Sequence, residues 1–536
     1  MVTGGDAPVI PLLYPRAEPD FPDPRKVLGL PLAILTVARP LVAAGFDVRL
    51  VDENVLPRAE DRLDEMPRPL FVGISCLGGG QVTAGLALAR ACKRRWPSVP
   101  VVWGGWNPTM LPHLYEAEEM APLVDVVVRG RGEEPALAIA RRLAEGRDLD
   151  GIPGVSWRDT AGRLRRNPDG ALDDPRDAPP LPYHLLADDW HRYLTGDGVL
   201  NVMSSYGCPH RCTFCGIPTQ TQTFRPVENG RLVEQLLDTR RLGIHTIVFY
   251  DDNFFTSRER VLDLSRRLVE AGSPLEWHCN GRVDQLSALS DDELALVARA
   301  GCRGVNVGYE TGDQHVADRV KKDVQVTDVF ALARRLHEAG IHLSINFMVG
   351  LPGETPERLL ASLETLLRIH ELHPGVEVCW YFFMPAPGTE AWDELVAEGR
   401  LSEPRTLAEH ARLQTMYLEH PWFYEDSPTD VMRDDRRLLK AITWLFRQRW
   451  APPPRSPLLR PFAALHRGWC RRRLDRRQFG ALPDWRLAFA LNALRTRLRW
   501  TAARLGRRRV FDRLRRPVPR RATGVPGVHP VPHGGD

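Results

Sequence analysis

The stretch VLNVMSSYGCPHRCTFC (199–215) runs from an apolar, strand-like segment directly into a loop that contains three cysteines. Cys208, Cys212 and Cys215 lie within eight positions, so one loop can bring their thiolates to a single metal centre. Three thiolates leave a coordination position open, which suits an iron–sulfur cluster that binds a further ligand. The alternative is a structural zinc loop, normally closed by four ligands, that takes His210 as its fourth.

Six apolar runs between residues 199 and 385 alternate with segments of helical period, such as RERVLDLSRRLVEAG (258–272). This alternation predicts six strand–helix units in a curved parallel sheet or partial TIM-type barrel. Chemistry in such barrels belongs to residues at the carboxyl ends of the strands. The expected strands are VLNVMSS (199–205), TIVFYDD (246–252), LEWHCNGRV (275–283), GVNVGYE (304–310), HLSINFMVG (342–350) and EVCWYFFMP (377–385).

The first ~150 residues show a separate alternation, which predicts a Rossmann-like, doubly wound parallel α/β sheet. Sheets of this kind bind ligands beyond the carboxyl ends of their strands. Small residues stand at those ends here, namely Ser75, Gly104, Gly105, Gly130 and Gly132. The expected strands are 9–15, 47–53, 70–76, 99–105 and 124–130.

The chain of 536 residues is longer than one hydrophobic core usually supports, so we expect several domains. Overall the fold class is α/β, with a mainly helical C-terminal region. The expected parts are the first sheet (1–150), a hairpin around Ala161-Gly162 followed by a Pro- and Asp-rich linker (151–194), the barrel core (195–390), a helical accessory region (391–450) and an Arg-rich tail with a disordered end (451–536).

The net charge of +4 conceals an uneven distribution. Residues 451–536 contain 21 arginines, no lysine and four aspartates, a balance of +17 that leaves −13 for the rest of the chain. A predicted helix, DWRLAFALNALRTRLRW (484–500), has leucines on one face and arginines mostly elsewhere. The tail could pack on the core, lie on an anionic membrane surface or bind a polyanion. No motif for nucleic-acid binding supports the last option.

Cysteine usage and the start of the chain indicate a reducing cytoplasm. Nine cysteines in so long a chain do not form a disulfide framework. The opening residues MVTGGDAPVIPLLYP lack the basic start and apolar run of a signal peptide. No run reaches the roughly 18 uncharged apolar residues of a membrane span.

The segment Cys208-Pro-His-Arg-Cys212-Thr-Phe-Cys215 resembles the cluster loop of the radical S-adenosylmethionine (SAM) superfamily, including the aromatic residue before the third cysteine. FYDDNFF (249–255), GCRGVNVGYETG (301–312) and NFMVGLPGET (346–355) resemble core motifs of the same superfamily. The resemblance implies a 4Fe-4S cluster held by the three cysteines. It also implies reductive cleavage of SAM, with an electron donor such as flavodoxin or ferredoxin.

The resemblance suggests SAM contacts at the strand ends. Asp251, Asp252 and Asn253 would lie near the SAM amino group, although the same residue types also begin helices. Arg282 would reach the SAM carboxylate or pair with Asp284.

Two later motifs complete the implied SAM site. Glu310 resembles the residue that hydrogen-bonds the SAM ribose, with a surface acid as the alternative. Gly350, Gly353 and Glu354 resemble the turn under the adenine, where glycine permits close backbone approach, or form an ordinary turn around Pro352.

Most of residues 1–150 resembles the cobalamin-binding domain that precedes many radical SAM cores, through VGISC, VVWGGWNPT and VVVRGRGEEP. By this resemblance the pocket for the cobalamin nucleotide tail is lined by Ser75, Gly104, Gly105, Thr109 and Gly130. The Asp-x-His-x-x-Gly motif of some such domains is missing, and we interpret His113 as a loop residue. The lower face of cobalt would then have no histidine ligand. The alternative is a degenerate scaffold that binds no cobalamin.

The combined resemblance implies a methyltransferase that acts on an unactivated carbon of a small molecule through methylcobalamin. A cobalamin-assisted cyclisation or rearrangement is the alternative, and a metal-stabilised binding protein is a more distant one. The aromatic residues Tyr309, Trp380 and Tyr381 either shape the substrate pocket or belong to the core.

Overall fold

The computed structural model describes residues 7–16, 29–56, 59–170, 178–193, 199–217, 223–411, 441, 444–445, 460–476 and 478. The chain divides into two compact units, residues 1–440 and 441–536. Both predicted α/β parts lie in the first unit. The predicted tail helix at 484–500 lies outside the described residues.

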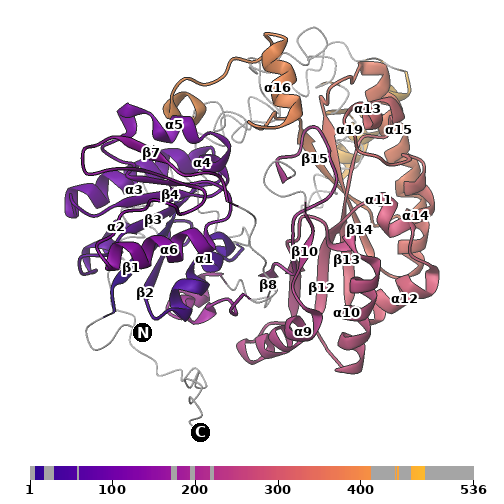
Figure 1. Cartoon of the computed structure of the whole chain (residues 1–536). Helices are drawn as coiled ribbons and strands as arrows, with labels where there is room; N and C mark the ends of the chain where they lie inside the picture. Colours follow the sequence, from indigo (N-terminus) through magenta and orange to yellow (C-terminus); the bar gives the residue numbers. More distant parts are fainter. Residues whose placement is uncertain are drawn as a thin grey trace. The chain divides into compact units, whose positions relative to one another are not determined.

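A seven-stranded sheet forms the N-terminal part of the first unit, with strand order β2-β1-β3-β4-β5-β6-β7 (Figure 1). The first five strands in sequence are parallel, which confirms the predicted Rossmann-like arrangement. Near-continuous apolar runs such as VIPLLY in β1 are buried because helices cover both faces. The parallel strands are β1 (Val9–Tyr14), β2 (Asp47–Asp52), β3 (Val72–Ser75), β4 (Val101–Gly104) and β5 (Val126–Val128).

Helices cover this sheet and complete its core. Ile34 and Ala38 of one helix and Ile139 and Ala140 of another join the apolar side chains of the strands in one buried cluster. The first helix ends before Gly45, whose positive φ of 89° is the left-handed conformation that terminates helices. The helical segments are α1 (Leu32–Ala43), α2 (Ala59–Asp64), α3 (Gly80–Arg95), α4 (Trp106–Met110), α5 (Pro112–Glu116), η1 (Glu118–Met120) and α6 (Glu133–Ala144).

The predicted hairpin extends this sheet. Its strands β6 (Val155–Arg158) and β7 (Leu164–Arg166) are antiparallel, and β6 pairs with β5. Gly162 provides the turn, with a φ of 76°. All three residues of β7 are exposed at the edge of the sheet.

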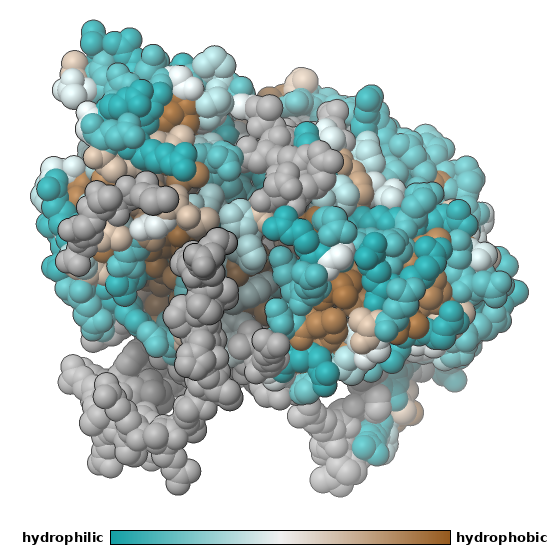
Figure 2. Space-filling model, turned by 60° about the horizontal axis from the view of Figure 1, so that its bottom comes forward, coloured by the Kyte–Doolittle hydropathy of each residue, from teal (hydrophilic) through white to brown (hydrophobic). Residues whose placement is uncertain are grey.

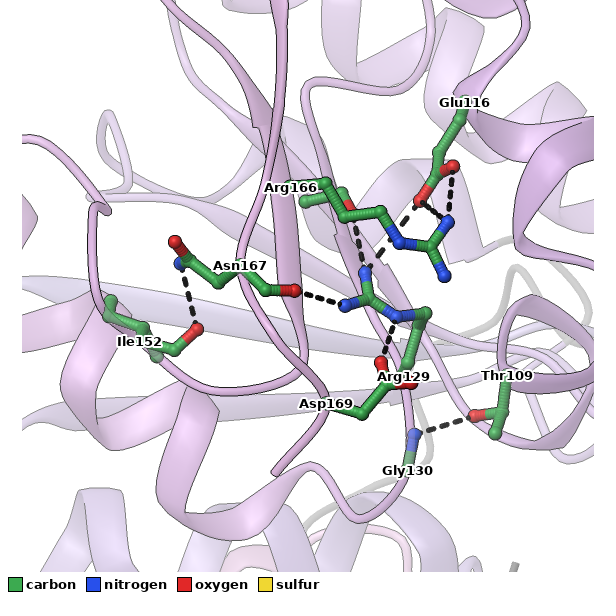
Figure 3. Close-up of polar contacts among 9 residues, drawn as sticks. Thr109, Glu116, Arg129, Gly130, Ile152, Arg166, Asn167 and Asp169 are labelled. Carbon is green, nitrogen blue, oxygen red and sulfur yellow. Dashed lines mark hydrogen bonds and ion pairs between the residues drawn. The ribbon is translucent and has the colours of Figure 1, made fainter. Parts of the chain in front are cut away.

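Arg129 joins the end of β5 to this hairpin (Figure 3). Its side chain is only 5% exposed, and all three of its guanidinium nitrogens donate hydrogen bonds. Nε donates to Oδ1 of Asp169 at 2.6 Å, Nη2 donates to the carbonyl of Asn167 at 2.7 Å, and Nη1 donates to Ser156. Glu116 completes the surroundings with an ion pair at 3.7 Å. A buried guanidinium needs such partners, so these contacts fix the backbone that leads into Gly130.

The second α/β part is a six-stranded sheet, entirely parallel, in the order β15-β14-β13-β12-β11-β8 (Figure 1). Each strand lies beside the next one along the chain, as in a TIM-type barrel. All six predicted runs form strands, so the predicted partial barrel is confirmed. The strands are β8 (Val199–Val202), β11 (Thr246–Phe249), β12 (Glu276–Gly281), β13 (Cys302–Glu310), β14 (His342–Val349) and β15 (Glu377–Phe382).

Helices connect these strands, and local signals begin several of them. Ser290 and Glu293 form a capping box at the start of α12, and Thr355 caps α15 with Pro356 in its first turn. The connecting elements are α9 (Asn229–Asp238), η4 (Thr239–Leu242), η5 (Phe254–Thr256), α10 (Arg258–Glu270), α11 (Val283–Ser287), α12 (Asp291–Arg299), α13 (Gln314–Arg319), α14 (Asp328–Glu338), α15 (Pro356–Leu372) and α16 (Glu390–Ala397). Four smaller elements complete the chain order: η3 (Tyr183–Leu186) and α7 (Trp190–Tyr193) precede β8 in the sequence, and β9 (Ser205–Tyr206) and β10 (Arg225–Pro226) follow it.

The second unit is described mainly by helix α19 (Arg460–Asp475). Its buried Cys470 packs with Ala441 and Leu445. Within the part of the chain that the structure describes, no helix combines the length and apolar character needed to cross a membrane. Hydrophilic residues cover most of the face shown in Figure 2, with separate hydrophobic patches between them.

His410 occupies a buried position beyond α16. The hydroxyl of Tyr115 donates to Oδ1 of Asn107 at 2.7 Å, which leaves the Asn107 amide nitrogen to donate to Nε2 of His410, also at 2.7 Å. The Nε2 atom must therefore be unprotonated. Burial lowers the pKa of His410 to about 4.

This buried imidazole should make folding sensitive to mild acid. Between an unfolded pKa near 6.5 and the folded value of about 4, the unfolded chain binds the proton and the folded chain does not, so stability falls as the pH drops through this window. The loss by pH 4 should be about 3 kcal/mol. The glutamine in His410→Gln accepts the Asn107 hydrogen bond without titrating. Urea midpoints measured between pH 7.5 and pH 4.5 should fall less steeply for this variant than for wild type.

The exposed His245 offers a matched control, and His245→Gln should leave the wild-type pH dependence unchanged. Parallel pH profiles for wild type and His410→Gln would contradict the assignment.

Candidate active site

The cysteine loop begins immediately after β9, and its two ends are held together. The short strands β9 and β10, which flank the loop, pair in antiparallel fashion. The loop is also attached to distant segments, because Thr213 donates to the carbonyl of Val320 and accepts from the amide of Ala391, both at 3.0 Å. Cys208, Cys212 and Cys215 are half-buried free thiols in this loop. The fold thus fixes all three on one loop that follows the first barrel strand.

Two side chains from neighbouring strand ends direct N–H groups at these sulfurs. Asn253, after β11, places Nδ2 4.0 Å from Sγ of Cys208, and Arg282, after β12, places Nη1 3.7 Å from Sγ of Cys212. The Oδ1 atom of Asn253 is buried and has no partner among the described residues. Donors to sulfur stabilise the thiolate form that a metal centre requires. The surroundings therefore suit anionic cluster ligands.

Burial opposes ionisation of the same thiols. It raises the pKa of Cys208 above its ordinary value and that of Cys215 to about 11, so both are protonated at neutral pH. Binding of a metal centre would displace these protons. Within the described ranges, no three His, Cys, Asp or Glu side chains form a group that could hold one metal ion. His210, the expected fourth ligand of the zinc alternative, has its Nε2 atom 3.2 Å from Nε2 of Gln285.

The predicted acids after β11 bind the chain itself. Asp251 is fully buried and accepts hydrogen bonds from the amide and hydroxyl of Ser204, both at 2.6 Å, and from the hydroxyl of Ser205 at 2.5 Å. Asp252 accepts from the amide of Gly207 at 2.8 Å. The hydrogen bonds of both carboxylates go to the segment that leads into the cysteine loop, so neither carboxylate acts as a helix cap. Sequence reasoning missed the serines, which show no motif of their own.

Arg282 pairs with Asp284, which was one of its two predicted roles, and it also contacts the backbone of Lys322. It forms an ion pair with Asp284 at 3.0 Å, and its Nη2 atom donates to the backbone carbonyl of Lys322. Together with its contact to Cys212, this guanidinium connects three segments around the loop. Lys322 was not predicted, since no sequence motif distinguishes it.

Glu310 lies at an irregular end of β13. The register with β14 shifts between Gly308 and Glu310, so Tyr309 is an extra residue, and Glu310 has a φ of 67°. Its carboxylate pairs with Nζ of Lys322 at 3.2 Å, with both side chains almost fully buried. Strained backbone of this kind concentrates at functional sites. Glu310 is thus a buried, paired acid rather than a surface acid.

The turn after β14 matches its predicted sequence motif. Gly350 has a φ of 88° and its amide donates to Oε2 of Glu354 at 2.5 Å. Burial, with a smaller contribution from Asp313, raises the pKa of Glu354 to about 8. Its Oε1 atom is buried and has no partner among the described residues. A carboxyl group that is protonated at neutral pH can donate a hydrogen bond to a ligand at this turn.

The small residues predicted to bind the cobalamin tail converge at the carboxyl edge of the first sheet. Ser75 ends β3 and pairs with Gly104 at the end of β4. The hydroxyl of Thr109 donates to the carbonyl of Gly105 at 2.7 Å. It also accepts from the amide of Gly130 at 3.0 Å (Figure 3). A Cβ atom on Gly105 would lie 2.7 Å from the carbonyl oxygen of Cys76, so only glycine fits there.

The remaining sequence candidates fall into two groups. Tyr309 is fully buried, with its hydroxyl bonded to the carbonyl of Val326, and Trp380 packs edge-on against Phe347. Both occupy the helix-covered side of the barrel sheet. Tyr381 is 50% exposed on the opposite side. His113 lies exposed in α5 rather than in a loop.

Known proteins share both parts of this architecture. Residues 25–140 match the model of the B12 binding domain, and residues 202–366 match that of the radical SAM superfamily. An uncharacterised methyltransferase of Pyrococcus horikoshii is 28% identical over 384 residues, which cover 70% of this chain and 80% of that protein. The hopanoid C-3 methylase of Methylococcus capsulatus is 27% identical over 68% of each chain.

A solved structure shares the fold. The radical SAM methyltransferase TsrM from Kitasatospora setae, determined with cobalamin and a 4Fe-4S cluster bound, superimposes with a TM-score of 0.63 at 20% identity. The superposition covers 77% of this chain and 82% of that one.

Thr109 gives a direct test of the edge of the first sheet. Thr109→Val keeps the shape of the side chain but removes both hydroxyl hydrogen bonds that hold the Gly105 and Gly130 backbones. The two hydrogen bonds stabilise the backbone of the binding site by about 1–2 kcal/mol. Without them, hydroxocobalamin binding should weaken roughly tenfold, as measured by equilibrium dialysis. Thr83→Val, at an exposed position of α3, should bind as wild type does. Equal affinity for the Thr109 variant and wild type would remove Thr109 from the site.

Proposed function

We propose that this cobalamin-dependent radical SAM enzyme, which joins a B12-binding domain to a radical SAM domain, transfers a methyl group from SAM to a carbon atom of a small molecule. The observation that carries the proposal is the presence of both domains in one chain. The names of its relatives, a methyltransferase and a hopanoid methylase, support methyl transfer as the reaction.

The residues of the cysteine loop fit the implied cluster. Cys208, Cys212 and Cys215 would hold it, while the N–H groups of Asn253 and Arg282 stabilise the thiolates. When bound, the cluster supplies the electron that cleaves SAM, and cobalamin supplies the cobalt atom that carries the methyl group. Asp251 keeps the loop in place through its hydrogen bonds with Ser204 and Ser205.

The proposed SAM contacts lie at the ends of β13 and β14. Glu354 has a buried Oε1 atom without a partner among the described residues, so it can bond the nucleoside portion of SAM. Gly350, with its positive φ, lets the backbone approach closely. Glu310, held by Lys322, is proposed for the ribose hydroxyls. On the first sheet, Ser75, Gly104, Gly105, Thr109 and Gly130 are proposed to surround the cobalamin tail.

The proposed reaction needs reducing partners. Reductive cleavage of SAM requires a one-electron donor, for which we propose a reduced flavodoxin or ferredoxin. All nine cysteines are free thiols, which supports a reducing, cytoplasmic environment. Recovery of the protein in an extracytoplasmic fraction would contradict this placement.

Helix α19 supports the proposed peripheral membrane contact of the basic region. Phe462 and Leu465 are 71% and 73% exposed, and Trp469 lies on the same side of the helix. The helix also carries five arginines and a single aspartate. An exposed apolar stripe among arginines suits an anionic lipid surface.

Vesicle binding tests this contact. The full chain should sediment with phosphatidylcholine vesicles that contain 25% phosphatidylglycerol, and the double variant Phe462→Ser, Leu465→Ser should bind at least fivefold less because it loses the apolar anchor. Val269→Ser, which changes an exposed apolar residue on α10, serves as the control. Equal sedimentation of the double variant and wild type would refute the role of α19.

Isotope transfer tests the central proposal. The chain, reconstituted anaerobically with iron, sulfide and hydroxocobalamin, should transfer label from methyl-labelled SAM to a carbon of the substrate. Cys212→Ala should lose the cluster and abolish SAM cleavage, because the remaining two thiolates cannot hold the centre. Iron and sulfide content and formation of 5′-deoxyadenosine are the measurements.

Cys92→Ala, which removes a buried thiol of helix α3, should retain the cluster. An unchanged iron and sulfide content in the Cys212 variant would contradict the assignment of Cys212 as a cluster ligand. SAM cleavage without any transfer of label would replace methylation by cyclisation or rearrangement.

A further inference from the structure

The two faces of the barrel sheet differ sharply in chemistry. On the face covered by helices, Val305, Val307, Leu343 and Ile345 are essentially fully buried. The centre of a packed barrel is normally filled by bulky branched residues as well. The opposite, inner face of this sheet instead carries polar side chains in its middle layers, namely Asn201, Asn280, Asn306, Ser344 and Asn346.

Two of these asparagines belong to a short chain of hydrogen bonds. Nδ2 of Asn280 donates to the backbone carbonyl of Asp251 at 3.3 Å, and Nδ2 of Asn306 donates to Oδ1 of Asn280 at 3.1 Å. The chain stops at Oδ1 of Asn306, which is buried and has no partner among the described residues. Both the Nδ2 and the Oδ1 atom of Asn280 therefore have hydrogen-bond partners, whereas the Oδ1 atom of Asn306 accepts no hydrogen bond from a described residue.

Asn346, on the adjacent strand β14, is less satisfied still. Its Oδ1 atom is buried, and its side chain forms no hydrogen bond with any residue that the structure describes. A buried amide oxygen without a partner destabilises the fold, and native proteins keep few such atoms. Two such oxygens lie on neighbouring strands of one face of the sheet, where a single bound molecule could donate to both.

The neighbours of Asn346 restrict the chemistry of that partner. In the strand register it lies beside Gly308 of β13 and Cys379 of β15, and Met348 lies beside the half-exposed Tyr381 one layer further along. The charges next to Gly308, on Glu310 and Lys322, cancel in an ion pair. The face therefore offers amide oxygens to a hydrogen-bond donor and apolar surface beside it, without a net charge.

We propose that Asn306 and Asn346 form the substrate subsite, and that the substrate is a largely apolar molecule with an uncharged donor group such as a hydroxyl or a ring or amide N–H. This assignment rests on the proposed methyltransferase function. In it, the two amides orient the substrate, while Met348 and Tyr381 contact its apolar part.

The thermal stability of the chain loaded with cluster and cobalamin, but without SAM, separates a binding role from a structural one. Asn346→Leu removes a buried unpaired oxygen and should raise the melting temperature by about 1–3 °C. The matched variant Asn280→Leu removes an amide that is bonded at both ends and should lower it. A lower melting temperature for Asn346→Leu would show a structural role and overturn the proposal.

Binding measurements separate substrate from SAM and test the donor requirement. SAM affinity by equilibrium dialysis should stay within twofold in Asn346→Leu, and a tenfold loss would assign the amide to SAM instead. The loaded wild type should bind the probe 2-naphthol at least threefold more tightly than 2-methoxynaphthalene, and the variant should not distinguish them. Equal binding of both probes by wild type would overturn the proposed donor group.

Failure of the methyltransferase proposal is recognised independently, because it would appear as missing label transfer in the wild type. The melting temperatures and probe affinities do not depend on that result.

Discussion

The buried carboxylate of Asp251 determines where the chemistry of this protein can take place. A charge excluded from water must be fully hydrogen-bonded, and three donors from Ser204 and Ser205 meet this requirement. These bonds tie the end of β11 to the segment that follows β8. Arg260 of α10 donates to the same Ser204. Protein contacts alone therefore fix the segment that leads into the cysteine loop.

Stability and ligand binding are assigned to different faces of the barrel sheet. The helix-covered face is closely packed and apolar, with Tyr309 and Phe347 among its fully buried side chains. The inner face holds unpaired amides and paired charges, which stabilise little without a ligand. Substitutions can thus change the inner face while the packing that maintains the sheet is preserved.

Local sequence patterns were sufficient for the strands and the cysteine loop, since both depend on neighbouring residues. Every predicted barrel strand formed, because a buried parallel strand requires a continuous apolar run. The surroundings of single residues depend on distant ones and were harder to predict. The partner of Asp251 is a serine 47 positions earlier, and the partner of Glu310 is Lys322, which no motif marks.

Face assignments were also only partly predictable. Tyr309 and Tyr381 were each expected either in the substrate pocket or in the core. Tyr309 follows the buried Val305 and Val307 in the alternation of β13 and belongs to the core, whereas Tyr381 is half-exposed. The hairpin around Ala161-Gly162 was recognised from its sequence. The contacts of Arg129 with Asn167 and Asp169, which lie 38 and 40 positions further along the chain, were not.

The edges of the seven-stranded sheet carry a further consequence. An edge strand exposes unpaired backbone groups that can pair with another chain. At one edge, β7 presents Arg165 and Arg166, paired with Asp159 and Glu116. At the other, β2 carries the ion pair of Arg49 with Asp47. Charged side chains at both edges oppose the growth of the sheet from one molecule to the next, so the same arginines that add to the protein's positive charge also guard it against aggregation.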